Sequence, residues 1–217
     1  MNTLFLKIIA IISMAIDHYG AIFAPNVEIY RYIGRIAFPI FCFLLVEGFI
    51  HTKDIKKYGQ RLIIFALISE IPFDLAFYGQ IGFQHQNIFF TLYIGLVMIH
   101  HLEKSHDSMK KLSIISIAMI FAFILAVDYN IIGIMYIAFF YFTKDMVRLK
   151  RLPLIALLLS LVNLPYRSMG QQFSLLALPL LYFYNGQLGP SNKLIKWSFY
   201  IFYPLHLAVF YLLQIIQ

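Results

Sequence analysis

Long apolar stretches follow one another along almost the entire chain, with only short polar segments between them. Of the 217 residues, 61% are hydrophobic and 12% are charged, whereas soluble domains hold roughly half apolar and a quarter charged residues. Such a chain lacks the polar surface of a soluble globule and is too apolar to be disordered. The sequence therefore predicts an all-α, polytopic bundle of transmembrane helices, with residues 1–217 forming a single integral membrane domain.

The apolar stretches predict about nine membrane spans, with eight or ten as alternatives. A full helical crossing needs about 20 residues, and several stretches are shorter than that. The count between residues 112 and 170 stays open for this reason. The predicted spans cover residues 4–24, 30–50, 59–79, 88–102, 112–127, 131–143, 153–166, 171–185 and 195–214.

Basic residues gather in alternate loops, which predicts the orientation in the membrane. If the N-terminus is cytoplasmic, the outer loops carry only Arg31 and Arg167, because positive charges collect on the cytoplasmic side. The same rule accounts for the net charge of +7 without a nucleic-acid partner. We expect a bacterial-type inner cell membrane with the C-terminus outside. The twelve cytoplasmic cations are Lys53, Lys56, Lys57, Lys104, Lys110, Lys111, Lys144, Arg148, Lys150, Arg151, Lys193 and Lys196.

Ionisable residues inside the apolar stretches are costly and mark function by default. With a rise of about 1.5 Å per residue, five of the six candidates below, all except Asp17, fall in one layer of the membrane, slightly nearer the outside. The alternative is a set of ion pairs that holds the bundle together, with Arg35 neutralising Asp17. The candidate catalytic residues are His18, Asp17, Arg35, Glu70, Asp74 and His206.

His18 is the leading candidate, because Lys7 precedes it by eleven residues. This spacing is about three helical turns, so the two side chains share a face, about 16 Å apart along the helix. An extended thioester arm fits that length if Lys7 holds its phosphates, although Lys7 alone is also a typical cytoplasmic anchor. The adjacent Asp17 points about 100° away from His18. We therefore expect Glu70 or Asp74, on another helix, to orient the imidazole.

A second polar cluster begins at Glu47 and continues through the basic loop that follows. Lys and Arg donors suit phosphate oxygens, although a basic loop that only sets topology has the same composition. His100 and His101 are adjacent and do not face each other on a helix, so we predict no metal site. The candidate cofactor-binding residues are Lys7, His51, Lys53, Lys56, Lys57 and Arg61.

Seven segments together resemble the TraX family of membrane proteins, and the likeness extends over essentially the whole chain. They include the run from Lys7 to Asp17-His18-Tyr-Gly20, the run Gly34-Arg35-Ile-Ala-Phe-Pro39, and the sequence Phe202-Tyr203-Pro204-Leu-His206. The other four segments cover residues 47–52, 58–62, 69–74 and 86–92.

The resemblance implies a polytopic acyltransferase, because the plasmid-borne namesake of the family is linked to N-terminal acetylation of pilin. Lys7 and His18 also look like a lysine version of the Arg-x10-His pattern of the membrane acyltransferase-3 superfamily. Acetyl-CoA would be the co-substrate. The residues expected to bind the acceptor or support the site are Glu47, Asn87, Thr91 and Tyr203.

The sequence and the resemblance together predict a transmembrane acetyltransferase that moves an acetyl group from cytosolic acetyl-CoA to an amine or hydroxyl at the outer side. The expected partners are the lipid bilayer, acyl-CoA and a peptide, glycan or lipid acceptor. Homo-oligomerisation stays open. A small proton-coupled transporter and a non-catalytic envelope assembly factor are the alternatives, since buried carboxylates and histidines also serve proton relays.

Overall fold

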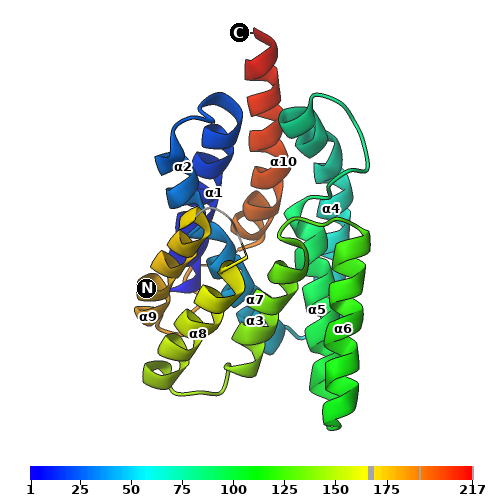
Figure 1. Ribbon diagram of the computed structural model, residues 1–217, viewed down its shortest axis with the longest axis vertical. Coiled ribbons are helices and arrows are strands. Elements are labelled where there is room, and N and C mark those ends of the chain that lie inside the picture. Colours follow the sequence, from blue (N-terminus) through cyan, green and yellow to red (C-terminus); the bar gives the residue numbers. More distant parts are fainter. Residues whose placement is uncertain (166–168, 191, 217) are drawn as a thin grey trace. The chain divides into compact units, whose positions relative to one another are not determined.

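The computed structural model describes residues 1–165, 169–190 and 192–216, and the described chain is all-helical (Figure 1). Within these ranges the only β pairing is an isolated bridge between Gln86 and Val127. The predicted all-α class is confirmed. Arg167, predicted in an outer loop, lies outside the described residues. The helices are α1 (Thr3–Phe23), α2 (Glu28–Gly34), α3 (Ala37–His51), α4 (Ile55–Tyr78), α5 (Ile88–Lys104), α6 (Ser108–Ile124), α7 (Asn130–Phe142), α8 (Arg148–Asn163), the 3-10 helix η1 (Met169–Leu176), α9 (Ala177–Tyr182) and α10 (Lys193–Ile216).

The helices group into two compact units. The first unit contains Met1–Phe41, Ile71–Ile81 and Val147–Gln217, and the second contains Cys42–Glu70 and Gly82–Met146. Helices α3 and α4 therefore contribute residues to both units. The single domain over residues 1–217 stays a prediction.

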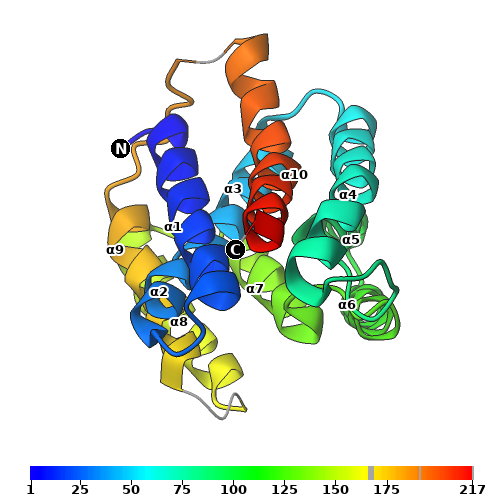
Figure 2. The ribbon, with the colours of Figure 1, turned by 90° about the horizontal axis from the view of Figure 1, so that it is seen from above.

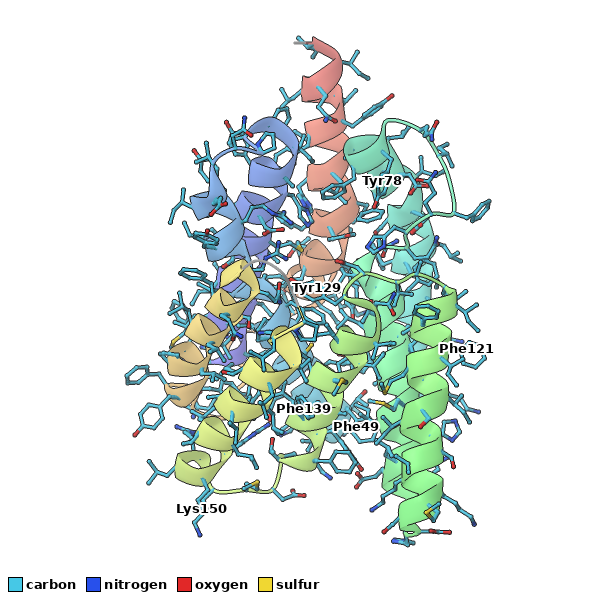
Figure 3. The ribbon with its side chains drawn as sticks, in the orientation of Figure 1. Phe49, Tyr78, Phe121, Tyr129, Phe139 and Lys150 are labelled. Atoms are coloured by element: carbon cyan, nitrogen blue, oxygen red, sulfur yellow. The ribbon has the colours of Figure 1, made fainter. Side chains whose placement is uncertain are left out.

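Within the described residues, three helices are long and apolar enough to cross a membrane: Thr3–Phe23, Glu28–His51 (α2 and α3 taken together) and Lys193–Ile216. Large apolar side chains are also exposed on the shorter helices. Phe121, for example, is 55% exposed and projects outward from α6 (Figure 3). Surface of this kind is stable against lipid rather than water, so the chain is a membrane protein. The nine spans and the orientation stay predictions.

Two predicted spans are interrupted in the structure. The span predicted at 30–50 is divided into α2 and α3 at Arg35 and Ile36. The span predicted at 171–185 consists of η1 followed by the six-residue α9. There, the Asn163 side-chain amide donates to the Gln171 carbonyl and to Ser174 Oγ. Because side-chain hydrogen bonds of this kind compete with the α-helical ladder, they favour the tighter helix here.

Two glycines allow α1 and α2 to pack closely. A Cβ atom at Gly20 would overlap with the Tyr30 side chain, and one at Gly34 would overlap with the Asp17 side chain. Small residues at such contacts let membrane helices approach each other closely. The contact at Gly34 holds α2 against the part of α1 that carries Asp17.

Helices α1 and α10 lie side by side in the first unit (Figure 2). The Lys7 ammonium lies over the Phe199 ring, with its nitrogen 5.4 Å from the ring centroid. Further along, His18 contacts His206. Because residue numbers increase together along both helices, α1 and α10 run parallel. Their contact surface carries the site described below.

In the second unit, α5 packs against α6 and α7 around a core that includes the fully buried side chains of Ile99, Ile134 and Ile137. At one end of this unit, two loops pair through their backbones. The Gln86 N–H donates to the Ala126 carbonyl at 3.0 Å, and the Asp128 N–H donates to the Gln86 carbonyl at 2.8 Å.

The second of these loops and the first residue of α7 hold three non-glycine residues in the left-handed region, namely Ala126, Tyr129 and Asn130, with φ between 45° and 57°. Figure 3 labels Tyr129, which directly precedes α7. Such backbone conformations cost of order 1–3 kcal/mol each and persist only where the surrounding contacts hold them. The backbone pairing with Gln86 supplies such contacts.

Candidate functional site: a buried histidine pair

The central feature of the first unit is a direct contact between two histidines from opposite ends of the sequence. His18 Nδ1 on α1 lies 2.8 Å from His206 Nε2 on α10, and the two residues are 9% and 8% exposed. The two ring planes are nearly parallel, inclined by 15°, and the centroids are 5.0 Å apart, so the imidazoles meet edge to edge. The structure thus brings together the two histidines that helical rise assigns to a common depth.

Aromatic rings surround the histidine pair. The Phe77 ring meets His18 edge-on at 5.1 Å between centroids, and Phe202 stacks on His206 at 4.9 Å. Tyr203, a predicted support residue, is 3% exposed and its ring lies 5.6 Å from that of His206. Close packing of this kind excludes water and limits rotation of the imidazoles.

The partner of His18 Nδ1 differs from the prediction. A carboxylate of Glu70 or Asp74 was expected to orient the imidazole, but Nδ1 contacts His206 instead. Asp74 is 1% exposed on α4. Glu70 belongs to the second unit, where its Oε2 accepts a hydrogen bond from Asn87. Helix α10 supplies this contact because it runs directly alongside α1.

Asp17 is the centre of an ion-pair cluster next to the histidine pair. Its Oδ2 lies 2.6 Å from Arg31 Nη1, and Arg31 also donates to the Asp17 carbonyl at 3.0 Å. Arg35 Nη2 lies 4.0 Å from Asp17 Oδ1, at the limit of the contact that the sequence predicted. Two guanidinium groups therefore share one partly buried carboxylate, and Arg31 makes the closer contact.

At the start of the same pair of helices, the Lys7 ammonium is influenced by the charge of a second lysine. Lys196 on α10 is near enough for its charge to act on the Lys7 ammonium. The Phe199 ring beneath Lys7 provides a cation–π contact. Two neighbouring ammonium groups repel each other, and an anion between them would relieve that repulsion.

In the second unit, Asn87 is fully buried and connects α4 to α5. Its side-chain nitrogen donates to Glu70 Oε2 at 2.5 Å and to the Ala66 carbonyl at 2.8 Å, and its Oδ1 caps α5 by accepting from the Phe89 N–H. Thr91 is also fully buried, and its hydroxyl donates to the Asp128 carbonyl at 2.5 Å. These bonds give Asn87 and Thr91 structural roles within their unit.

His85 forms an ion pair in the loop beside this group. Its Nε2 lies 3.6 Å from Asp128 Oδ1. The hydrogen bond with Asp128 raises the pKa of His85 above its ordinary value; burial opposes this, and the charges of Asp128 and Glu70 add to it. The protonated form of His85 is therefore favoured in the fold.

The predicted cytoplasmic cluster is mostly exposed. The imidazole of His51 donates from Nδ1 to the Glu47 carbonyl at 2.9 Å, and the exposed Lys57 pairs with Asp54 at 3.3 Å. The Arg61 guanidinium lies over the Tyr58 ring at 5.3 Å. In the described part of the chain, its buried Nε has no hydrogen-bond partner. Lys53 and Lys56 are also exposed.

Several residues of these clusters were not predicted from the sequence, among them Arg31, Lys196, His85 and Asp128. Arg31 was assigned to an outer loop, yet it lies four residues before Arg35 and so shares its helical face. His85 and Asp128 lie in separate loops, and no sequence pattern indicates that these loops pair. Among the described residues, no three His, Cys, Asp or Glu side chains gather as a metal site would require.

The fold and the site define an all-helical membrane protein with a buried pair of histidines inside the bundle. The chain belongs to the TraX family: the family model, described as TraX protein, matches residues 3–214. The family resemblance seen in the sequence is thereby confirmed, and the likeness to the acyltransferase-3 superfamily stays a prediction.

Two curated relatives show how far the similarity extends. The chain is 31% identical, over 94% of its length and 92% of the relative's, to the "Probable fimbrial assembly protein FimC, serogroup H1" of Dichelobacter nodosus. It is 36% identical, over 48% of its length and 38% of the relative's, to an uncharacterized protein of Rickettsia prowazekii (strain Madrid E). No solved structure matches the chain.

Proposed function

We propose that the protein is a transmembrane acetyltransferase that uses acetyl-CoA and acts on an amine or hydroxyl acceptor at the outer side of the membrane. The observation that carries this proposal is the hydrogen-bonded pair of His18 and His206, buried among aromatic rings. A neutral imidazole in such a site is a suitable general base for acyl transfer. Membership of the TraX family is consistent with this activity.

In the proposed reaction with an amine, the acceptor nitrogen attacks the thioester carbonyl carbon of acetyl-CoA. A new C–N bond forms, and the C–S bond breaks so that its electron pair leaves with the sulfur. His18 takes the proton that the attacking nitrogen loses and then passes it to the CoA thiolate, which returns His18 to its neutral form. The products are the acetylated acceptor and CoA. Direct transfer is the simpler route, and a transient acetyl-His18 would give the same products.

Lys7 and Lys196 are the groups that we assign to the phosphates of acetyl-CoA. The charges of the two lysines act on each other, and Lys7 lies eleven residues before His18 on the same helix. That spacing corresponds to about 16 Å, which suits an extended pantetheine arm. The basic residues 53–61 stay a predicted part of cofactor binding, for which Lys53, Lys56 and Lys57 are exposed cations that suit phosphate oxygens.

We also infer that the N-terminus is cytoplasmic, the C-terminus is outside and the chain crosses the membrane about nine times. The parallel course of α1 and α10 supports this, since an odd number of crossings ends in a helix that runs in the direction of the first. Labelling of a single cysteine introduced at position 56, in a protein without Cys42, shows on which side of the membrane the α3–α4 loop lies. Labelling of that cysteine from outside the cell would contradict the orientation.

The proposed activity is tested with purified protein in detergent. Acetyl-CoA should raise the temperature of thermal unfolding, CoA should be released slowly by hydrolysis, and release should accelerate when acceptor is added. His18→Ala should lower turnover by about 10²- to 10⁴-fold while acetyl-CoA still stabilises the protein. If wild-type protein neither binds acetyl-CoA nor releases CoA with any acceptor preparation, the enzyme proposal is wrong.

The acceptor itself is found by mass spectrometry of envelope peptides and glycans from cells with and without the protein. The expected difference is the loss of one acetyl group from a single class of molecule. Cells that carry His18→Ala should match cells without the protein, because catalysis and not the presence of the protein causes the mass change.

A second candidate is a non-catalytic role in the assembly of surface fibres. It is favoured by the name of the Dichelobacter nodosus relative, which is described as a probable fimbrial assembly protein. Under this candidate, the histidine pair only stabilises the bundle. His18→Ala would then leave fibre assembly intact in cells whenever the variant folds, whereas the acetyltransferase proposal expects the variant to behave as a null in the acylation assay.

A further inference from the structure

The histidine pair belongs to a chain of hydrogen bonds that begins at a backbone carbonyl. His206 Nδ1 lies 2.9 Å from the Phe202 carbonyl oxygen, and His206 Nε2 lies 2.8 Å from His18 Nδ1. A carbonyl oxygen can only accept, so His206 Nδ1 carries a hydrogen. The Nε2 of neutral His206 then holds a lone pair and accepts from His18 Nδ1–H. Neutral His18 is left with its lone pair on Nε2.

Packing fixes the two rings in this arrangement. His206 is held between Phe202, which stacks on it at 13°, and the edge-on ring of Phe210 at 5.6 Å between centroids. His18 lies in nearly the same plane as His206 and meets Phe77 edge-on. A flip of either ring would move a C–H group into a position that a hydrogen-bonding nitrogen now occupies. Burial of both rings also favours the uncharged pair, because an unpaired charge at this site would be costly.

We propose that His206 is the positioning residue for His18, and that it selects the tautomer in which His18 Nε2 is the atom that takes the acceptor's proton. This inference rests on the proposed acyl transfer. The Phe202 carbonyl fixes His206, and His206 in turn fixes His18. When His18 Nε2 gains the proton, His18 Nδ1–H continues to donate to His206. A buried imidazole thus performs the orienting task for which a carboxylate was expected.

Amide side chains test this assignment because each places one polar atom near the position of one imidazole nitrogen. In His206→Gln, Oε1 lies near the former Nε2 and can accept from His18. In His206→Asn, the amide nitrogen lies near the former Nδ1 and can donate to the Phe202 carbonyl, but no group accepts from His18. Gln should therefore retain most of the turnover, whereas Asn should lower kcat by about 10²-fold or more with little change in KM for acetyl-CoA.

The two variants have the same functional group and differ by one methylene, so each serves as the control for the other. Thermal unfolding must show that both fold. Equal turnover of His206→Gln and His206→Asn would overturn the proposal, as would a loss that appears only in KM.

A spectroscopic test does not depend on activity. Protein with ¹⁵N-labelled histidine is measured by NMR, and the signals of His18 and His206 are assigned by substituting the other histidines one at a time. Both residues should show the hydrogen on Nδ1, and a scalar coupling should connect His18 Nδ1 to His206 Nε2 through the hydrogen bond. A hydrogen on Nε2 of His18 would refute the assignment.

The NMR and turnover results separate the two proposals. If the coupling is present but no CoA is released, the hydrogen-bond chain stands and the acetyltransferase proposal fails. If CoA is released but His18 carries its hydrogen on Nε2, the enzyme proposal stands and the positioning role of His206 fails.

Discussion

Asn87 should be one of the most sensitive positions of the second unit. Its side-chain amide makes three hydrogen bonds. Oδ1 caps α5 by accepting from the Phe89 N–H, and the nitrogen donates to both Glu70 and the Ala66 carbonyl. Loss of a helix cap costs about 0.5–2 kcal/mol. A bond to a charged group contributes about 1.5–3 kcal/mol, and a neutral bond about 0.5–1.5 kcal/mol. Asn87→Ala should therefore lower the free energy of unfolding by about 2.5–6.5 kcal/mol.

Two further variants separate these contributions. Asn87→Ser keeps a capping oxygen and should recover about 1 kcal/mol relative to Ala. Asn87→Asp also keeps the cap but sets a second carboxylate against Glu70, so it should be no better than Ala. The Glu70→Gln substitution should rescue Asn87→Asp, because Gln can donate to the new carboxylate.

Equilibrium unfolding of the purified protein in detergent, followed by circular dichroism, measures each difference. A loss of less than about 1 kcal/mol for Asn87→Ala would refute the role of the buried network. The reasoning also fails if Asn87→Asp lowers the free energy of unfolding by the same amount whether residue 70 is Glu or Gln.

Three other outcomes are expected. Gly34→Ala should lower the thermal unfolding temperature, because its new methyl group overlaps with the Asp17 side chain and pushes α2 from α1; an unchanged temperature would contradict that close contact. Arg31→Gln should destabilise the protein more than Arg31→Lys, since Gln leaves Asp17 without its nearest charge; equal stabilities in thermal unfolding would assign the pairing to another group. The ion pair of His85 and Asp128 should stabilise the loop pairing below the unfolded pKa of about 6.5, and this contribution should fade as pH rises through the raised folded pKa. Hydrogen exchange of the amides of the paired loops measures this effect, and Asp128→Asn should remove the pH dependence.

The sequence predicts the helical class and the shared depth of the two histidines because both depend on local rules. Apolar composition requires helices in lipid, and a constant rise per residue converts position into depth. The interruption of the span at 30–50 was not predictable in the same way. The break follows directly after the close contact of Gly34 with Asp17, and a contact between two helices cannot be read from apolar composition.

The contact of His18 with His206 could not be predicted for a related reason. Depth restricts which groups can meet, but it does not specify which helices are neighbours. Carboxylates are the usual partners of catalytic histidines, so Glu70 and Asp74 were the natural expectation. The parallel packing of α1 against α10 places His206 there instead. Arg31 was not predicted as a partner of Asp17 because it was assigned to a loop and Arg35 to a span. The four-residue spacing between them, which places both near Asp17, was therefore not considered.

The partners of Asp17 and His18 become available at very different times during synthesis. Arg31 follows Asp17 by 14 residues, whereas His206 follows His18 by 188 residues. At about 5–20 residues per second, the counter-charge of Asp17 is made within about 1–3 s, and the partner of His18 is made about 10–40 s after His18 itself. The side chain that is costly to leave unpaired in lipid is therefore neutralised early by a local hairpin. The imidazole can remain uncharged until the last helix joins, so a chain that stops before α10 contains the Asp17–Arg31 pair but lacks the histidine pair.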